Sequence, residues 1–177
     1  RLAKKDEAIA QLLNLSSFAE YMLVHEHAIV KVREDMPLDR GALIGCGVTT
    51  GVGAVIHTAG VEPGSTVAVI GCGGVGLSAI NGAAIAGAAR IIAVDMVESK
   101  LELARKFGAT DVVNASEVDA IGEIREMTGG GVHYSFEAIG LKQTAEQAFK
   151  MLGFGATATI IGMIPVGTMV ELHGPEF

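Results

Sequence analysis

The sequence has no tryptophan, and aromatic residues make up only 5 % of its 177 residues. Two cysteines are too few for the disulfide framework that stabilises small secreted domains. The formal net charge of −7 argues against a nucleic-acid or anionic-membrane surface. We find no uninterrupted run of roughly 18 apolar residues and no secretion signal. We therefore expect a cytoplasmic protein with no membrane span and no nucleic-acid partner.

Aliphatic residues and glycine are abundant instead, with 50 % hydrophobic residues and 24 glycines. This composition is typical of an α/β domain with buried strands and tight turns. Apolar strands alternate with helices, the strands being predicted at 66–70, 90–94, 111–114, 132–137 and 156–161, and two of the helices at 120–128 and 143–152. This order predicts a Rossmann-type, doubly wound parallel sheet, with ligands at the carboxyl ends of its strands.

The first 60 residues follow a different pattern. Short strands are predicted at 17–24 and 29–32, a helical turn from Pro37, and a helix at 51–58. These are too few strands for a domain, so we interpret residues 1–60 as the end of a preceding domain. Residues 61–177 then form a second domain, and we expect the chain to be a fragment.

The segment from Gly71 to Gly76 has the spacing G-x-G-x-x-G between a strand and a helix. Gly71 lets the chain turn off the strand, Gly73 removes a side chain where a pyrophosphate approaches, and Gly76 lets the helix pack closely on the sheet. The free N–H groups and positive dipole end at the helix start would face the pyrophosphate. The pattern predicts a dinucleotide site.

Asp95 ends the second predicted strand, 19 residues after Gly76. Its carboxylate can accept hydrogen bonds from the adenosine ribose, whereas the 2′-phosphate of NADP would be repelled by up to about 4 kcal/mol per charge pair. We therefore predict NAD as the cofactor. Two other classes remain open: a non-catalytic dinucleotide-binding module, and an adenosylmethionine-dependent methyltransferase, which would not need Gly76.

Four segments together carry a resemblance to a known family: 17–21, 45–51, 63–76 and 108–111. They resemble the zinc-dependent alcohol dehydrogenase branch of the medium-chain dehydrogenases. The resemblance implies that residues 1–60 come from a GroES-like catalytic domain, and that residues 61–177 form an NAD-binding domain without the last strand of its sheet. It also implies hydride transfer between nicotinamide and a small alcohol or aldehyde, with zinc as a second cofactor, in a homodimer or homotetramer.

The resemblance further assigns roles to individual residues. Cys46 would be a ligand of the catalytic zinc, Thr50 and Val75 would pack against the nicotinamide, and Lys100 would join Asp95 at the ribose. The other implied cofactor contacts are Gly74 in the loop, Ile139 on the adenine side, and Ile161, Gly162 and Met163 at a strand end beside the carboxamide.

A catalytic zinc needs three protein ligands. The resemblance implies that the other two, a cysteine and a histidine, lie in segments that this sequence lacks, so we expect the fragment to be inactive alone. Without the resemblance, Cys46 would be interpreted as a buried helix cysteine. Glu137, at the end of a predicted strand, either lines the cofactor site or is structural.

Overall fold

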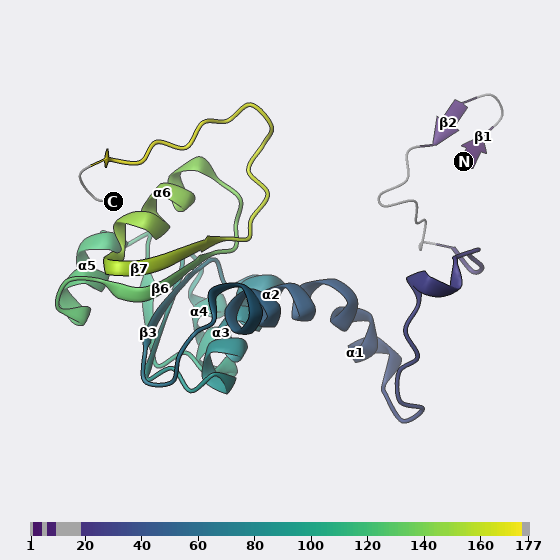
Figure 1. Cartoon of the computed structure of the whole chain (residues 1–177), viewed down its shortest axis with the longest axis horizontal. Helices are drawn as coiled ribbons and strands as arrows, with labels where there is room; N and C mark the ends of the chain where they lie inside the picture. Colours follow the sequence, from purple (N-terminus) through teal and green to yellow (C-terminus); the bar gives the residue numbers. More distant parts are fainter. Residues whose placement is uncertain (1, 5–6, 10–18, 175–177) are drawn as a thin grey trace. The chain divides into compact units, whose positions relative to one another are not determined.

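The computed structural model describes residues 2–4, 7–9 and 19–174, which fall into two compact units that divide between Gly41 and Ala42 (Figure 1). In the first unit, β1 (Leu2–Lys4) and β2 (Glu7–Ile9) pair antiparallel. A 3₁₀ turn, η2, follows at Glu26–Ala28. The predicted strands at 17–24 and 29–32 are wrong over the described residues, which are not in strands, and 17–18 lie outside that part. An isolated strand with no sheet to join is not stable.

The second unit is built on five parallel strands in the order β5-β4-β3-β6-β7. Their bounds are β3 (Thr66–Ile70), β4 (Arg90–Asp95), β5 (Asp111–Asn114), β6 (Val132–Glu137) and β7 (Leu152–Ile160). The helices between them are α3 (Gly74–Ile85), α4 (Glu98–Phe107), α5 (Ala120–Thr128) and α6 (Lys142–Lys150). The predicted doubly wound α/β sheet is confirmed.

Side chains alternate along the strands to build one core on each face of the sheet. Val67 and Val69 belong to the cluster that contains Ile80 of α3 and Leu101 of α4. The neighbouring residues of β3, Ala68 and Ile70, point into the other cluster, with members of α5 and α6. Continuous apolar strands of this kind are expected where both faces are covered.

The edge strand β7 departs from the predicted boundaries. It begins at Leu152, where the helix was expected to end, and α6 stops at Lys150. The pairing with β6 jumps from Val132–Leu152 to Tyr134–Thr157, so β7 contains a bulge. Gly155, with φ +70°, supplies the left-handed backbone there.

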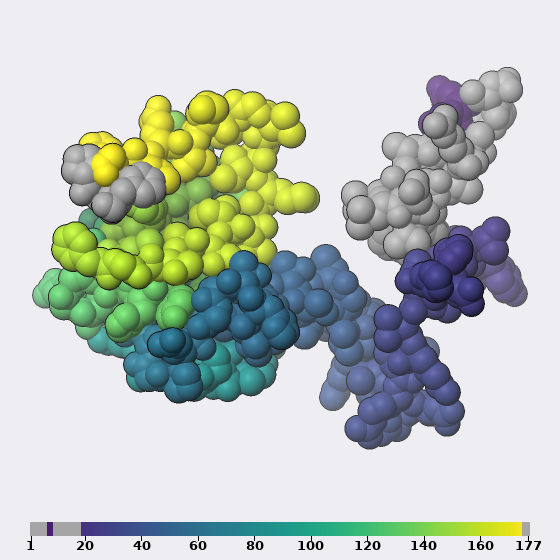
Figure 2. Space-filling model, in the orientation of Figure 1, coloured from purple at the N-terminus to yellow at the C-terminus, as the bar shows by residue number. Residues whose placement is uncertain are grey.

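The segment after β7 runs beside α6 (Figure 2). At this contact the Glu171 N–H donates to Oε1 of Glu146 at 3.0 Å.

Residues 42–59 are helical and belong to the second unit. The end of α1 (Leu38–Leu43) leads directly into η3 (Ile44–Val48), α2 (Thr49–Gly53) and η4 (Ala54–Ala59), with π-helical turns in η3 and η4. A Cβ at Gly51 would lie 2.4 Å from the carbonyl oxygen of Val75, so α2 packs closely on α3. The origin of residues 1–60 in a catalytic domain stays a prediction.

The stretch Leu38–Ala59 is long and apolar enough to cross a membrane, with a mean hydropathy of 1.5, contrary to the expectation from the sequence. Length and composition are weak support for a span, because packing helices pass the same test. Within the second unit, Gly51, Ala54 and Val55 of this stretch are buried, but only 17 % of its apolar window is buried overall.

Candidate functional site

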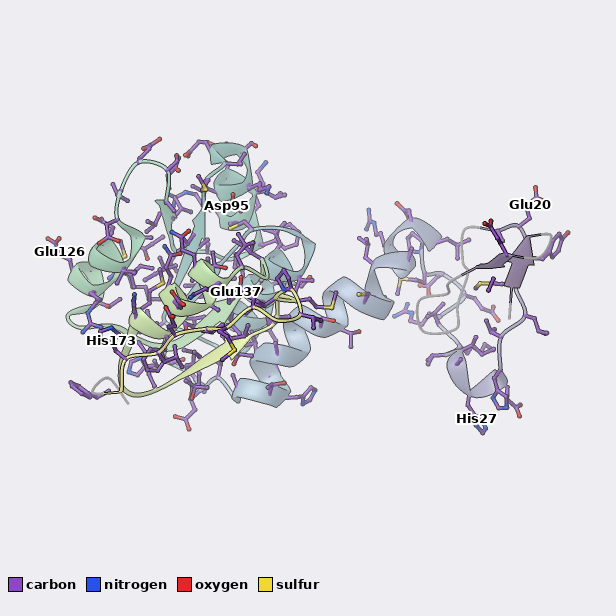
Figure 3. All side chains as sticks on the ribbon, turned by 90° about the horizontal axis from the view of Figure 1, so that it is seen from above. Glu20, His27, Asp95, Glu126, Glu137 and His173 are labelled. Atoms are coloured by element: carbon purple, nitrogen blue, oxygen red, sulfur yellow. The ribbon has the colours of Figure 1, made fainter. Side chains whose placement is uncertain are left out.

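The carboxyl ends of β3, β4 and β6 meet at one edge of the sheet. Ile70 is in register with Val94 on one side and with Glu137 on the other. The chain leaves β3 for β4 in one direction, and the later strands β6 and β7 extend the sheet in the other. Such a reversal of strand order is where open α/β sheets bind ligands. The loop at residues 71–76, called the phosphate loop below, is thereby brought to the same edge as Asp95 and Glu137. Figure 3 labels the two acidic residues.

Two glycines of the loop are required by the protein's own packing. Gly71 has φ +95°, and a Cβ there would lie 2.5 Å from Cγ1 of Ile139. A Cβ at Gly76 would lie 1.7 Å from the carbonyl oxygen of Gly71. The close approach of α3 to the end of β3 therefore depends on the missing side chain at Gly76, as the motif predicts.

The other two glycines of the loop are not required by packing. A Cβ at Gly73 or Gly74 would have no atom within 4 Å. Gly73 has φ −79° and ψ −172°, an extended conformation that any residue adopts. The lack of side chains at these two positions leaves the backbone open to a ligand.

The start of α3 supplies a partial positive charge, which complements a negatively charged ligand. Gly73 is the N-cap of this 12-residue helix and has no side chain to cap it. The first hydrogen bond of α3 runs from the Leu77 N–H to the Gly73 carbonyl at 2.8 Å. The N–H groups of the first turn therefore have no partner within the helix. The residues present fit the pyrophosphate of a dinucleotide.

Asp95 is held by backbone N–H groups. Its Oδ2 accepts from Cys72 at 2.8 Å, and its Oδ1 accepts from Met96 at 2.8 Å and from Val97 at 3.1 Å. The ammonium of Lys100 lies 3.8 Å from Oδ2, with the Lys100 side chain 49 % exposed and that of Asp95 9 % exposed. The carboxylate is thus fixed beside the phosphate loop, and Lys100 reaches it from the solvent side.

Cys72 contributes its backbone rather than its thiol. The residue is 1 % exposed, and burial, followed by the nearby Asp95 carboxylate, raises the pKa of the Cys72 thiol to about 12. The side chain is therefore protonated at neutral pH and is not a nucleophile. Sequence reasoning missed the link from its N–H to Asp95, because any residue except proline offers the same donor.

Ile139 and the strand end at 161–163 are brought together around Glu137. Ile139 lies against Gly71, and a Cβ at Gly140 would lie 2.7 Å from the carbonyl oxygen of Met163. The N–H groups of Ile161 and Gly162 donate to the Glu137 carbonyl. Met163 is 92 % exposed. The structure places these residues at the same sheet edge as the loop; their roles as cofactor contacts stay predictions.

Cys46 and Thr50 lie one turn apart on the helical stretch that packs against α3. Cys46 is exposed in η3, so its interpretation as a buried helix cysteine is wrong. Thr50 is exposed in α2. Within the described part of the chain, no three side chains from His, Cys, Asp and Glu are grouped to hold a metal. Cys46 alone does not fit a zinc ion, which needs three protein ligands.

Comparison with protein families gives one match: residues 74–175 match the family described as zinc-binding dehydrogenase. Among curated relatives, "Alcohol dehydrogenase-like 5" of Arabidopsis thaliana is 47 % identical over 158 residues, 88 % of this chain and 41 % of that protein. "Probable S-(hydroxymethyl)glutathione dehydrogenase 1" of Schizosaccharomyces pombe is 41 % identical over 176 residues, 98 % of this chain and 46 % of that protein. The chain spans about half the length of the curated relatives it matches.

Solved structures agree on the fold. An "Alcohol dehydrogenase zinc-binding domain protein" from Burkholderia ambifaria superposes with a TM-score of 0.81 at 44 % identity, over 83 % of this chain and 40 % of that one. Benzyl alcohol dehydrogenase from Acinetobacter calcoaceticus gives 0.80 at 39 %, over 83 % and 41 %. A putative zinc-binding dehydrogenase from Sinorhizobium meliloti, solved bound to NADP, gives 0.71 at 30 %, over 74 % and 39 %.

Proposed function

We propose, from the premise that this chain belongs to the zinc-binding dehydrogenase family, that it is the dinucleotide-binding part of an NAD-dependent alcohol oxidoreductase. The observation that carries the proposal is the loop before α3. Gly71 and Gly76 are glycines because the protein's packing needs them, whereas Gly73 and Gly74 are open toward the ligand side. A glycine-rich turn that served packing alone would need only the first pair.

The chain's share of the reaction is positioning. The dinucleotide, when bound, supplies the hydride chemistry between nicotinamide and a small alcohol or aldehyde. The first turn of α3 holds the pyrophosphate, and Asp95 with Lys100 holds the adenosine ribose. Thr50, Val75, Ile139 and the strand end at 161–163 are proposed to hold the adenine and the nicotinamide in place.

NAD is proposed over NADP because of Asp95. A 2′-phosphate would stand beside this carboxylate, and Lys100, half exposed and 3.8 Å from Oδ2, offsets only part of the repulsion. The wild-type chain should bind NADH at least about tenfold more tightly than NADPH, a difference of about 1.4 kcal/mol. Asp95→Asn, which keeps an oxygen acceptor but removes the charge, should narrow this ratio in fluorescence titrations. An unchanged ratio would remove Asp95 from the ribose site.

For the whole protein we propose zinc-dependent turnover, with Cys46 as one zinc ligand. The 177-residue chain alone should bind NADH weakly, hold no stoichiometric zinc and oxidise no simple alcohol. The test is an assay of both forms with NAD and a panel of small alcohols, together with elemental analysis and the mass in solution, for which a homodimer or homotetramer is proposed. Turnover by the 177-residue chain would contradict the assignment of Cys46 as a ligand that needs companions elsewhere.

Two other outcomes of these assays identify the alternative classes. NADH binding by a whole protein without zinc or turnover would identify a non-catalytic binding module. Tighter binding of adenosylmethionine than of NADH would identify a methyltransferase. The open positions at Gly73 and Gly74 favour the larger dinucleotide, because a pyrophosphate occupies the start of α3.

A further inference from the structure

We propose that Glu137 is a positioning residue for the dinucleotide site: its buried carboxylate fixes the turn at residues 138–140 against the phosphate loop and the end of β7. The inference rests on the proposed function and adds to it a residue outside the glycine motif. Glu137 ends β6 at the ligand edge of the sheet and is labelled with Asp95 in Figure 3.

One carboxylate oxygen holds the turn. Oε1 of Glu137 accepts the N–H of Ile139 at 2.9 Å and the N–H of Gly140 at 2.8 Å. The same oxygen accepts the hydroxyl of Thr144, in the first turn of α6, at 2.7 Å. Hydrogen bonds to a carboxylate are about twice as strong as those between neutral groups, so three donors on one oxygen define the position of the turn tightly.

The backbone carbonyl of Glu137 holds the segment that follows β7 against the same turn. Its carbonyl accepts the N–H of Ile161 at 2.8 Å and that of Gly162 at 3.1 Å. A Cβ at Gly162 would lie 2.1 Å from the nitrogen of Gly140 and 2.5 Å from Oε2 of Glu137. The turn and the strand end therefore touch backbone to backbone, and one cannot shift without the other.

The turn at residues 138–140 also contacts the phosphate loop. The Ala138 N–H donates to the Ile70 carbonyl at 2.9 Å, at the last residue of β3. The side chain of Ile139 fills the space beside Gly71, where a Cβ would lie 2.5 Å from Cγ1 of Ile139. Through Ile139, the position that Glu137 sets for the turn is carried to the first glycine of the loop.

Stability alone does not explain a carboxylate at this place. Glu137 is 0 % exposed, and its Oε2 has no hydrogen-bond partner among the described residues. Burying an acceptor without a partner costs free energy, and Oε2 bears that cost here. What a carboxylate supplies here, and an apolar or neutral side chain could not, is a charged acceptor for two successive N–H groups of the turn.

The test compares affinity with stability in the 177-residue chain. Glu137→Gln keeps an oxygen for the turn but removes the charge, so the turn should occupy its binding position for a smaller fraction of the time. The apparent Kd rises in inverse proportion to that fraction, and we expect NADH to bind about tenfold more weakly by calorimetric titration. Thr144→Val keeps the carboxylate and removes one of its donors, and should weaken NADH binding two- to threefold by the same reasoning.

Ser135→Ala is the matched control. Ser135 lies two residues before Glu137 on β6, is also 0 % exposed, and also bonds to α6, through its hydroxyl to the Ala148 carbonyl at 2.7 Å. Among the described residues Ser135 makes no side-chain hydrogen bond to the turn, so removing its hydroxyl should lower the thermal midpoint while the NADH affinity changes less than twofold. Amide exchange at Ile139 and Gly140 should speed up in Glu137→Gln and stay unchanged in Ser135→Ala.

The outcomes are distinguishable. Wild-type affinity in both Glu137→Gln and Thr144→Val would overturn the positioning role and leave the proposed function intact. An equal loss of affinity in Ser135→Ala and Glu137→Gln would also overturn it, because general loosening of β6 would then suffice. If the wild-type chain itself failed to bind NADH, the proposed function would be refuted, and this inference with it.

Discussion

Replacing Gly73 with alanine is expected to abolish most dinucleotide binding while leaving the fold as stable as before. The added Cβ meets no atom within 4 Å, and the backbone at φ −79° suits alanine. Alanine is a poorer N-cap than glycine by about 0.5–1 kcal/mol, but it also reduces the entropy of the unfolded chain by about 0.4–1 kcal/mol. These effects nearly cancel, so the free energy of unfolding should change by less than about 0.5 kcal/mol.

The binding energy should respond very differently. A methyl group on the open face of the loop occupies the approach of the pyrophosphate to the N–H groups of α3, and we expect at least tenfold weaker NADH binding, about 1.4 kcal/mol. Gly76→Ala is the contrasting variant, because its Cβ would start 1.7 Å from the Gly71 carbonyl oxygen. Helix α3 would have to move, and destabilisation of about 3 kcal/mol or more is expected.

Both quantities can be measured on the same samples. Urea unfolding is followed by circular dichroism, since the chain has no tryptophan, and NADH binding by calorimetry. Wild-type affinity in Gly73→Ala would refute the reasoning that this glycine is kept open for a ligand. Equal destabilisation in Gly73→Ala and Gly76→Ala would show that the loop glycines serve packing alone.

Three further predictions concern the two cysteines and the ion pair that joins β4 to β5. A thiol reagent at pH 8 should modify the exposed Cys46 and spare Cys72, whose burial raises its thiol pKa to about 12; mass spectrometry locates the label, and rapid labelling of Cys72 would contradict the packing described. In the whole protein, Cys46→Ser should lower zinc content and alcohol oxidation but leave NADH affinity within about twofold, and full zinc content by elemental analysis would remove Cys46 as a ligand. Arg90 bonds Asp111 at 2.9 Å through two nitrogens and lowers its pKa below the ordinary 3.8, so this pair stabilises the fold above that pH and ceases to as the pH falls through the lowered value. Asp111→Asn should therefore cost about 1 kcal/mol at pH 7 in urea unfolding and progressively less as the pH falls below 3.8, and a constant difference would contradict the linkage.

Patterns along the chain predict the parts of the fold that depend on local residues. Strand β3 and helix α5 have the predicted bounds, because an apolar run of 66–70 and a cap at Asp119 are local signals. The start of β7 could not be predicted in this way. Its register with β6 jumps at a bulge in which Gly155 takes a left-handed conformation, and that choice depends on the partner strand.

At the site, too, residues with a local sequence signal could be predicted, whereas contacts between distant parts of the chain could not. The spacing of Gly71, Gly76 and Asp95 identifies the loop from the sequence, since each residue type is needed for its own geometry. The three donors on Glu137 could not be found, because two of them are backbone N–H groups that carry no signature in the sequence. Cys46 shows the reverse, since only the resemblance singles it out and the described residues offer it no companion ligands.

The most direct test of the dinucleotide site is a titration of the ¹⁵N-labelled 177-residue chain with NADH, followed by amide chemical shifts. We expect saturable shifts centred on the amides of Gly73, Gly74 and Val75 at the start of α3, with smaller shifts at Met96 and Val97 beside the Asp95 carboxylate. Adding AMP alone should reproduce the shifts beside Asp95 and leave most of those at the loop unchanged. Saturable shifts confined to other parts of the chain, or none at millimolar NADH, would contradict the claim that this edge of the sheet binds a dinucleotide.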